Sequence, residues 1–263
     1  MSIFEKFAGR SKRRFAEADC LAPTAEQQAA FAREEQMYGL GDDRALDGLG
    51  LMKALMLYRP RPIGKYLASI GRRYSMLHPD VLALLYYLAR HARGDILEIG
   101  PYVGGSTIAA AQGVRDARHP KKIVTIEHGM MVGNSRLGSG DTIEDLKRNL
   151  AREGVANLVQ IIVGEARAKS TVESVGYHLG PQSVGVFVMD ADGAIKDALQ
   201  SYSELLIDNC WVVVDDYFAV GAGINKAMHS KLEIDSLVDS AVLTTAGFFG
   251  WGTWIGQWRR NAK

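Results

Sequence analysis

Cysteine is scarce in this sequence, which excludes two kinds of small-domain scaffold. The chain has 263 residues and two cysteines, Cys20 and Cys210. Two thiols so far apart form neither a disulfide framework nor a zinc site. Cys210 opens an apolar run and is expected to be a buried core thiol. The fold must therefore rely on a hydrophobic core, which the 47% of apolar residues can supply.

Long hydrophobic runs and an excess of one charge are also missing. No window holds about eighteen consecutive apolar residues, so no transmembrane helix is indicated. The N-terminal sequence MSIFEKFAGRSKRRF lacks the apolar centre of a signal peptide. The formal net charge is +1, whereas a nucleic-acid track needs a basic stripe. We therefore expect a soluble, cytoplasmic protein with neither a membrane nor a nucleic-acid partner.

The middle of the chain carries short apolar runs rich in β-branched residues, each followed by a glycine or an acid. They lie at residues 96–99, 123–126, 159–163, 184–189 and 211–214. Such continuous runs are typical of strands covered on both faces of a parallel sheet. Helical patterns separate them at residues 104–114, 141–153 and 194–207. The alternation predicts βαβ units and an α/β, doubly wound, mostly parallel sheet.

The two ends of the chain differ from this middle part. Residues 1–92 are helical and loop-rich, which predicts an N-terminal helical cap before a ligand-binding domain at 93–263. Residues 241–245 and 253–258 indicate two strands around a Gly/aromatic turn, and strands so joined are expected to be antiparallel. The predicted fold is therefore a seven-stranded Rossmann-like sheet that ends in an antiparallel hairpin.

A glycine-rich bend follows the first predicted strand. It runs Glu98-Ile99-Gly100-Pro101-Tyr102-Val103-Gly104-Gly105-Ser106-Thr107. Glycines allow a ligand close to the backbone, and the following helix N-terminus favours an anionic group. Glu127, at the end of the second strand, can accept both ribose hydroxyls of an adenosine ligand. An NAD site uses the same acid, but it requires G-x-G-x-x-G, which this spacing matches poorly.

Acidic residues follow the fourth and fifth strands. Asp190 ends the fourth, in Met189-Asp190-Ala191-Asp192-Gly193, and Asp215 and Asp216 end the fifth. The two strands are expected to be neighbours, so their carboxyl ends should share one crevice. Carboxylates crowded in this way repel unless a cation or a proton intervenes. Oxygen ligands favour Mg²⁺ or another hard divalent cation, although the acids could instead cap helices or bind substrate.

With these motifs, the run from Asp95 to Gly221 resembles the small cation-dependent O-methyltransferases of the catechol and caffeoyl-CoA type, and related bacterial natural-product methyltransferases. The resemblance implies S-adenosylmethionine (SAM) as methyl donor and Mg²⁺ or a similar ion as second cofactor. It implies metal ligation by Asp190, Asp215 and Asp216. It implies SAM contacts from Glu98, Gly100, Tyr102, Gly104, Ser106, Glu127, Gly164, Glu165, Ala166 and Asp190.

The sequence departs from that family at two positions. Gly105 stands where the SAM loop usually has tyrosine, and Gly193 stands where a catalytic lysine follows the D-A-D motif. The general base is therefore open, with Lys196, His128 and His229 as candidates. A base is not strictly required, since a divalent metal can lower the pKa of a bound hydroxyl.

The expected activity is O-methylation of a small molecule such as a phenol, a sugar or another secondary metabolite. Without a metal, N-methylation is also open. The alternatives are an NAD-dependent oxidoreductase and a catalytically silent SAM-binding protein. The glycine-rich segment 129–140 is either a flexible loop or a lid. Aromatic residues in the hairpin, among them Trp251, are either core or dimer contacts or an acceptor wall, and a homodimer is expected.

Overall fold

The computed structural model describes residues 25–40, 47–133, 136–219 and 223–260. Cys20 therefore lies outside the described residues. The helices are α1 (Ala25–Met37), α2 (Gly48–Tyr58), α3 (Pro62–Tyr74), α4 (Pro79–His91), α5 (Gly105–Arg115), α6 (Thr142–Arg152), α7 (Lys169–Leu179), α8 (Ile195–Tyr202) and α9 (Ile224–Asp239), with a short 3₁₀ turn, η4 (Ala156–Leu158). The strands are β1 (Asp95–Ile99), β2 (Ile123–Glu127), β3 (Val159–Val163), β4 (Val184–Met189), β5 (Leu206–Val214), β6 (Leu243–Phe249) and β7 (Thr253–Trp258).

The strands form one sheet with the order β3-β2-β1-β4-β5-β7-β6. Strands β1 to β5 pair in parallel, and β7 pairs antiparallel with both β5 and β6. The predicted doubly wound sheet with an antiparallel C-terminal hairpin is thus confirmed. The helix expected over 194–207 is shorter than predicted, because α8 ends at Tyr202 and β5 already begins at Leu206.

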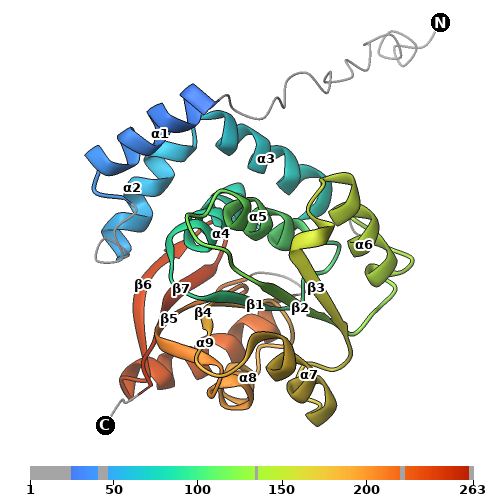
Figure 1. Cartoon of the computed structure of the whole chain (residues 1–263). Coiled ribbons are helices and arrows are strands. Elements are labelled where there is room, and N and C mark those ends of the chain that lie inside the picture. Colours follow the sequence, from blue (N-terminus) through green and yellow to red (C-terminus); the bar gives the residue numbers. More distant parts are fainter. Residues whose placement is uncertain (1–24, 41–46, 134–135, 220–222, 261–263) are drawn as a thin grey trace, which may run out of the picture.

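Helices cover both faces of the sheet (Figure 1). Helices α4, α5 and α6 lie on one face and α7, α8 and α9 on the other. Alternate strand residues feed the two cores: Val186 and Val188 point to the first, and Phe187 and Met189 to the second. This two-sided burial explains why the strands have continuous apolar sequences. Cys210 is buried in the second core, as expected.

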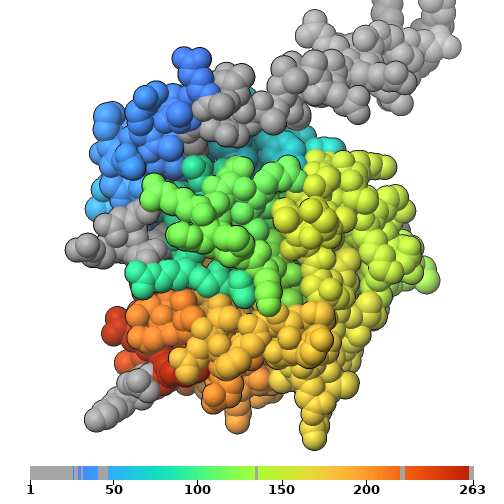
Figure 2. Space-filling model, viewed as in Figure 1, coloured from blue at the N-terminus to red at the C-terminus, as the bar shows by residue number. Residues whose placement is uncertain are grey.

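The N-terminal helices pack on the outside of α4 and α5. Helices α2 and α3 contribute Leu51, Leu67 and Ile70 to the same core as the first face of the sheet. Figure 2 shows these blue and cyan segments as one surface with the green and yellow ones. Glu35 of α1 is buried and forms an ion pair with Arg90 of α4 at 2.9 Å. The division predicted at residues 92 and 93 stays a prediction.

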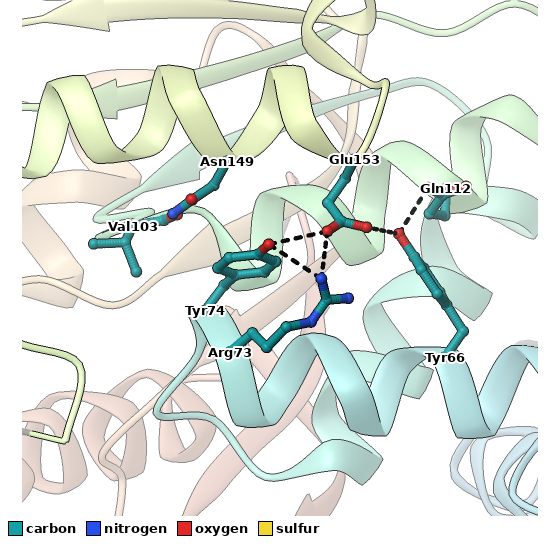
Figure 3. Close-up of polar contacts among 7 residues, drawn as sticks. All are labelled: Tyr66, Arg73, Tyr74, Val103, Gln112, Asn149 and Glu153. Carbon is teal, nitrogen blue, oxygen red and sulfur yellow. Dashed lines mark hydrogen bonds and ion pairs between the residues drawn. The ribbon is translucent and has the colours of Figure 1, made fainter. Parts of the chain in front are cut away.

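A second polar cluster ties α3 to α6 (Figure 3). The carboxylate of Glu153, just after α6, accepts hydrogen bonds from the hydroxyls of Tyr66 at 2.9 Å and Tyr74 at 3.0 Å. Arg73 forms an ion pair with the same carboxylate at 2.8 Å. Gln112 of α5 donates to the Tyr66 hydroxyl, so three helices meet at this point. Among the described residues, every helix is too short or too polar to span a bilayer.

Candidate active site

The glycine-rich bend links the end of β1 to the start of α5. Glu98 of β1 is buried beneath it and accepts hydrogen bonds from Thr107 at 2.6 Å and Thr125 at 2.9 Å. Burial raises the pKa of Glu98, and the hydroxyls of Ser106, Thr107 and Thr125 oppose that shift. Glu98 therefore fastens α5 and β2 to β1. A direct contact between Glu98 and SAM stays a prediction.

Neighbouring segments hold the bend in place. Asn149 of α6 is buried and donates to the carbonyl of Val103 at 2.9 Å (Figure 3). The Tyr102 hydroxyl donates to the carbonyl of Leu137, which lies in the glycine-rich segment after β2. The bend is thus connected to α6 and to that segment. These contacts position Gly100, Gly104 and Ser106, but they do not test whether those residues bind SAM.

Glu127 lies buried at the end of β2, next to β1. Its Oε1 atom accepts hydrogen bonds from the backbone N–H of Gly129 at 3.0 Å and from Thr142 at 3.3 Å. The neighbouring strand β3 ends at Val163, and the N–H of Gly164 donates to the Glu127 carbonyl at 3.0 Å. Glu165 is exposed and Ala166 is half-buried beside this strand end. The predicted ribose and adenine contacts therefore lie on adjacent strand ends.

The acidic residues come together as the strand order predicts. Met189 of β4 is in register with Ile99 of β1 and Val214 of β5. Asp190 and Asp215 directly follow this row. Carboxylate oxygens of Asp190, Asp215 and Asp216 all lie within 4.8 Å of one another.

The environment of Asp215 differs from that of its two neighbours. Its Oδ1 atom accepts a hydrogen bond from Thr253 of β7 at 2.6 Å. Burial, followed by the negative charge of Asp190, raises the pKa of Asp215 to about 7. This shift is the expected response of a carboxyl group that is buried and also lies beside like charges.

A lysine that the sequence reasoning missed occupies the acidic cluster. The Nζ atom of Lys226, in the first turn of α9, lies 2.7 Å from Oδ1 of Asp190 and 2.9 Å from Oδ2 of Asp216. Burial lowers the pKa of Lys226, but the charges of Asp190 and Asp216 outweigh burial and raise it overall. The three carboxylates alone fit a divalent cation. With the ammonium of Lys226 in place, they do not.

The three predicted base candidates contact residues outside the acidic cluster. The ammonium of Lys196 donates to Ser236 at 3.0 Å, on the outer part of α9. His229 is half-exposed and lies 3.1 Å from Glu233 on the same helix. His128 is also about half-exposed, with Nδ1 3.8 Å from Glu127. Their catalytic roles stay predictions. In this structure, Lys226 is the basic side chain in contact with the acids.

Gly193 explains how α9 comes so close to the D-A-D segment. Its φ angle is +81°, which side chains other than glycine rarely adopt. A Cβ atom there would lie 2.8 Å from Oγ of Ser230 and 3.2 Å from the carbonyl of Lys226. Asp192 meanwhile pairs with Arg167 at 2.7 Å rather than with the cluster. The absence of a side chain at residue 193 thus admits the helix that carries Lys226.

Comparison with known proteins agrees with this arrangement. Residues 97–217 match a family model described as a methyltransferase domain. That range contains the bend, Glu127 and all three acids of the cluster. Among curated proteins, no sequence matches this chain.

Solved structures share the fold. A Staphylococcus aureus protein provisionally described as a caffeoyl-CoA O-methyltransferase is 20% identical, with a TM-score of 0.55, over 80% of this chain and 99% of that one. The O-methyltransferase NovP is 18% identical, with a TM-score of 0.51, over 68% of this chain and 79% of its own. At these identities the similarity establishes the fold.

The fold is that of class I SAM-dependent methyltransferases, and residues 97–217, a little under half of the chain, match a methyltransferase domain. The match favours this class over the alternative of an NAD-dependent oxidoreductase.

Proposed function

We propose that this protein transfers the methyl group of SAM to a hydroxyl group of a small molecule. The observation that supports this most directly is the acidic cluster beside the glycine-rich bend. Polar groups that can orient a hydroxyl, at the ends of β4 and β5, lie next to the strand end that the resemblance assigns to the methyl donor. Ligands of open α/β sheets bind at this edge.

In the proposed complex, SAM lies over residues 100–106, its ribose hydroxyls bind Glu127, and its adenine lies near 164–166. The acceptor oxygen attacks the sulfonium methyl in line. The S–CH₃ bond breaks, an O–CH₃ bond forms, and the hydroxyl proton leaves the oxygen. The products are S-adenosylhomocysteine, a methyl ether and a proton. The protein contributes positioning and exclusion of water.

A pocket of about 310 Å³ near this edge is a candidate acceptor site. It lies between the end of α3, the segment after β2 and the β6–β7 turn. Its lining includes Arg72, Met76, Arg136 and Trp251. Trp251 is two residues before Thr253, which bonds to Asp215. The mixture of apolar and cationic side chains suits a phenol or another flat secondary metabolite that carries polar substituents.

SAM binding tests the first half of this proposal. Isothermal titration with SAM should show binding, and NAD should not bind. Glu127→Ala should weaken SAM binding by about 1–3 kcal/mol, the cost of leaving two hydroxyls unpaired. Glu144→Ala, which removes an exposed carboxylate on α6, is the control and should leave the affinity unchanged. Equal SAM affinities in all three proteins would place the ribose elsewhere.

Methyl transfer tests the second half. Incubation with SAM and a panel of catechols, sugars and amines should give a methyl ether, detected by mass spectrometry. Methylation of amines alone would support N-methylation instead. SAM binding without any product across the panel would support the silent SAM-binding alternative.

A further inference from the structure

The charge balance of the acidic cluster depends on Lys226. Three carboxylates converge within 4.8 Å, and a single ammonium group contacts two of them. The side chains of Asp190, Asp216 and Lys226 are only 30%, 33% and 24% exposed. Carboxylates this close need a counter-charge, and a lysine ammonium or a metal ion can supply it.

The position of Lys226 on its helix makes this contact a specific one. Lys226 lies in the first turn of α9, where the helix dipole disfavours a positive charge. A lysine in that turn would normally extend into water. Here its ammonium is instead directed at two carboxylates from the ends of other elements, at hydrogen-bonding distance.

The backbone around the cluster is arranged to admit this lysine. At Gly193 a Cβ atom would lie 2.8 Å from Oγ of Ser230 and 3.2 Å from the carbonyl of Lys226, so α9 packs tightly against the D-A-D segment. Helix α9 is thereby held against the loop that carries Asp190. The packing of α9 fixes the backbone position of Lys226, and its ammonium group is thereby held near the carboxylates.

A divalent ion would compete with Lys226 for the same carboxylates. Mg²⁺ binds oxygen ligands at about 2.0–2.1 Å in an octahedral arrangement. Oδ1 of Asp190 and Oδ2 of Asp216 already accept from the ammonium, and a second cation close to it would be repelled. We infer that Lys226 takes the place of a divalent metal at the Asp190–Asp215–Asp216 cluster, so that this protein works without a metal ion there.

Mn²⁺ binding, measured without SAM, tests this inference separately from the proposed methyl transfer. Metal-stripped wild-type protein and Lys226→Met are titrated with Mn²⁺, and free Mn²⁺ is followed by electron paramagnetic resonance. Lys226→Met should bind Mn²⁺ at least about tenfold more tightly than the wild type, because the oxygens become free while the carboxylate charge remains. Lys226→Arg keeps the positive charge, so its Mn²⁺ affinity should stay as weak as that of the wild type.

Two control variants assign the effect. Lys231→Met removes a lysine of α9 that pairs with Asp235, and its Mn²⁺ affinity should equal that of the wild type. Adding Asp190→Asn to Lys226→Met should abolish the gained binding. Equal Mn²⁺ affinities for wild type and Lys226→Met, or no binding by either, would overturn the inference.

If Lys226→Met does not fold, a comparison of the wild type with Asp190→Asn still decides. Tight, stoichiometric Mn²⁺ binding by the wild type that disappears in Asp190→Asn would then overturn the inference, whereas weak binding equal in both would support it. Once an acceptor is known, turnover should also persist in excess EDTA. A failure to find any methyl transfer would count against the proposed function and leave the Mn²⁺ result standing.

Discussion

At the scale of single residues, Gly193 and Gly154 form a natural comparison. Both have positive φ angles, +81° and +67°, but of the two only Gly193 has close neighbours that a Cβ atom would meet. Gly154→Ala should therefore cost about 1 kcal/mol of backbone strain. Gly193→Ala should cost roughly 2–3 kcal/mol, because α9 must also move. Urea denaturation measures the loss of unfolding free energy in each variant. Equal losses in the two variants would show that the contact between residue 193 and α9 is loose.

The acids of the site could be predicted from single residues, whereas Lys226 could not. Asp190, Asp215 and Asp216 directly follow apolar strands, and the order of parallel strands brings such ends together. Lys226 is 36 positions from Asp190, and its placement depends on how closely α9 packs. The available signal was indirect: Gly193 stands where the related family has a lysine, so the cluster lacked a nearby cation in the sequence.

At the scale of secondary-structure elements, the buried carboxylate of Glu35 docks α1 onto α4. Burial raises the pKa of Glu35, but the hydrogen bond to His91 and the charge of Arg90 lower it overall, to below its usual value. A lowered folded-state pKa gives stability that is present above about pH 4.5 and is lost as the pH falls through the folded pKa.

Glu35→Gln should therefore lower the free energy of unfolding by about 1–3 kcal/mol at pH 7. The difference in unfolding free energy between this variant and the wild type should narrow as the pH falls from about 5 to 3. Glu34→Gln is the matched control, because the neighbouring Glu34 is 32% exposed in its pair with Arg61, and it should change stability by less than about 1 kcal/mol. Denaturant unfolding at each pH gives the comparison. A gap that stays constant with pH would show that Glu35 acts through packing rather than charge.

Elements could be predicted where the pattern of burial is simple. Strands β3, β4 and β7 match the predicted ranges. Two-sided burial explains the uninterrupted apolar run of β4, in which all residues are buried. The composition of residues 40–50, which is rich in glycine and aspartate, predicts a loop. Helix α2 nevertheless begins at Gly48, because the side chain of Asp47 caps it. A cap can start a helix at Gly48 despite its low propensity, once Leu51 and Leu55 pack in the core.

At the scale of the whole molecule, the N-terminal helices and the sheet share one core. Helix α4 alone buries Val81, Leu82, Ala83, Leu84, Leu85, Tyr86, Tyr87, Leu88 and Ala89. Fully burying a large apolar side chain is worth about 1.5–3 kcal/mol, and a whole domain is stable by only about 5–15 kcal/mol. The sheet domain therefore depends on α4 for its stability.

A chain that begins at residue 93 should consequently fail to unfold cooperatively on heating, as followed by circular dichroism. A chain that begins at residue 79 keeps α4 and should retain a cooperative transition at lower temperature. The full-length protein should show a single transition. A sharp transition for the chain from residue 93 would instead support independent folding of the predicted 93–263 domain.

The register of the central strands has a further consequence for how such a protein can change its chemistry. Ile99, Met189 and Val214 form one row across β1, β4 and β5, and neighbouring strands lie about 4.8 Å apart. In the proposed complex, main-chain hydrogen bonding thus sets the span between the strand end assigned to the methyl donor and the acidic cluster. On this proposal, substitutions at the end of α3, in the segment after β2 and in the β6–β7 turn would change which acceptor fits, while the strand ends beneath them keep their spacing.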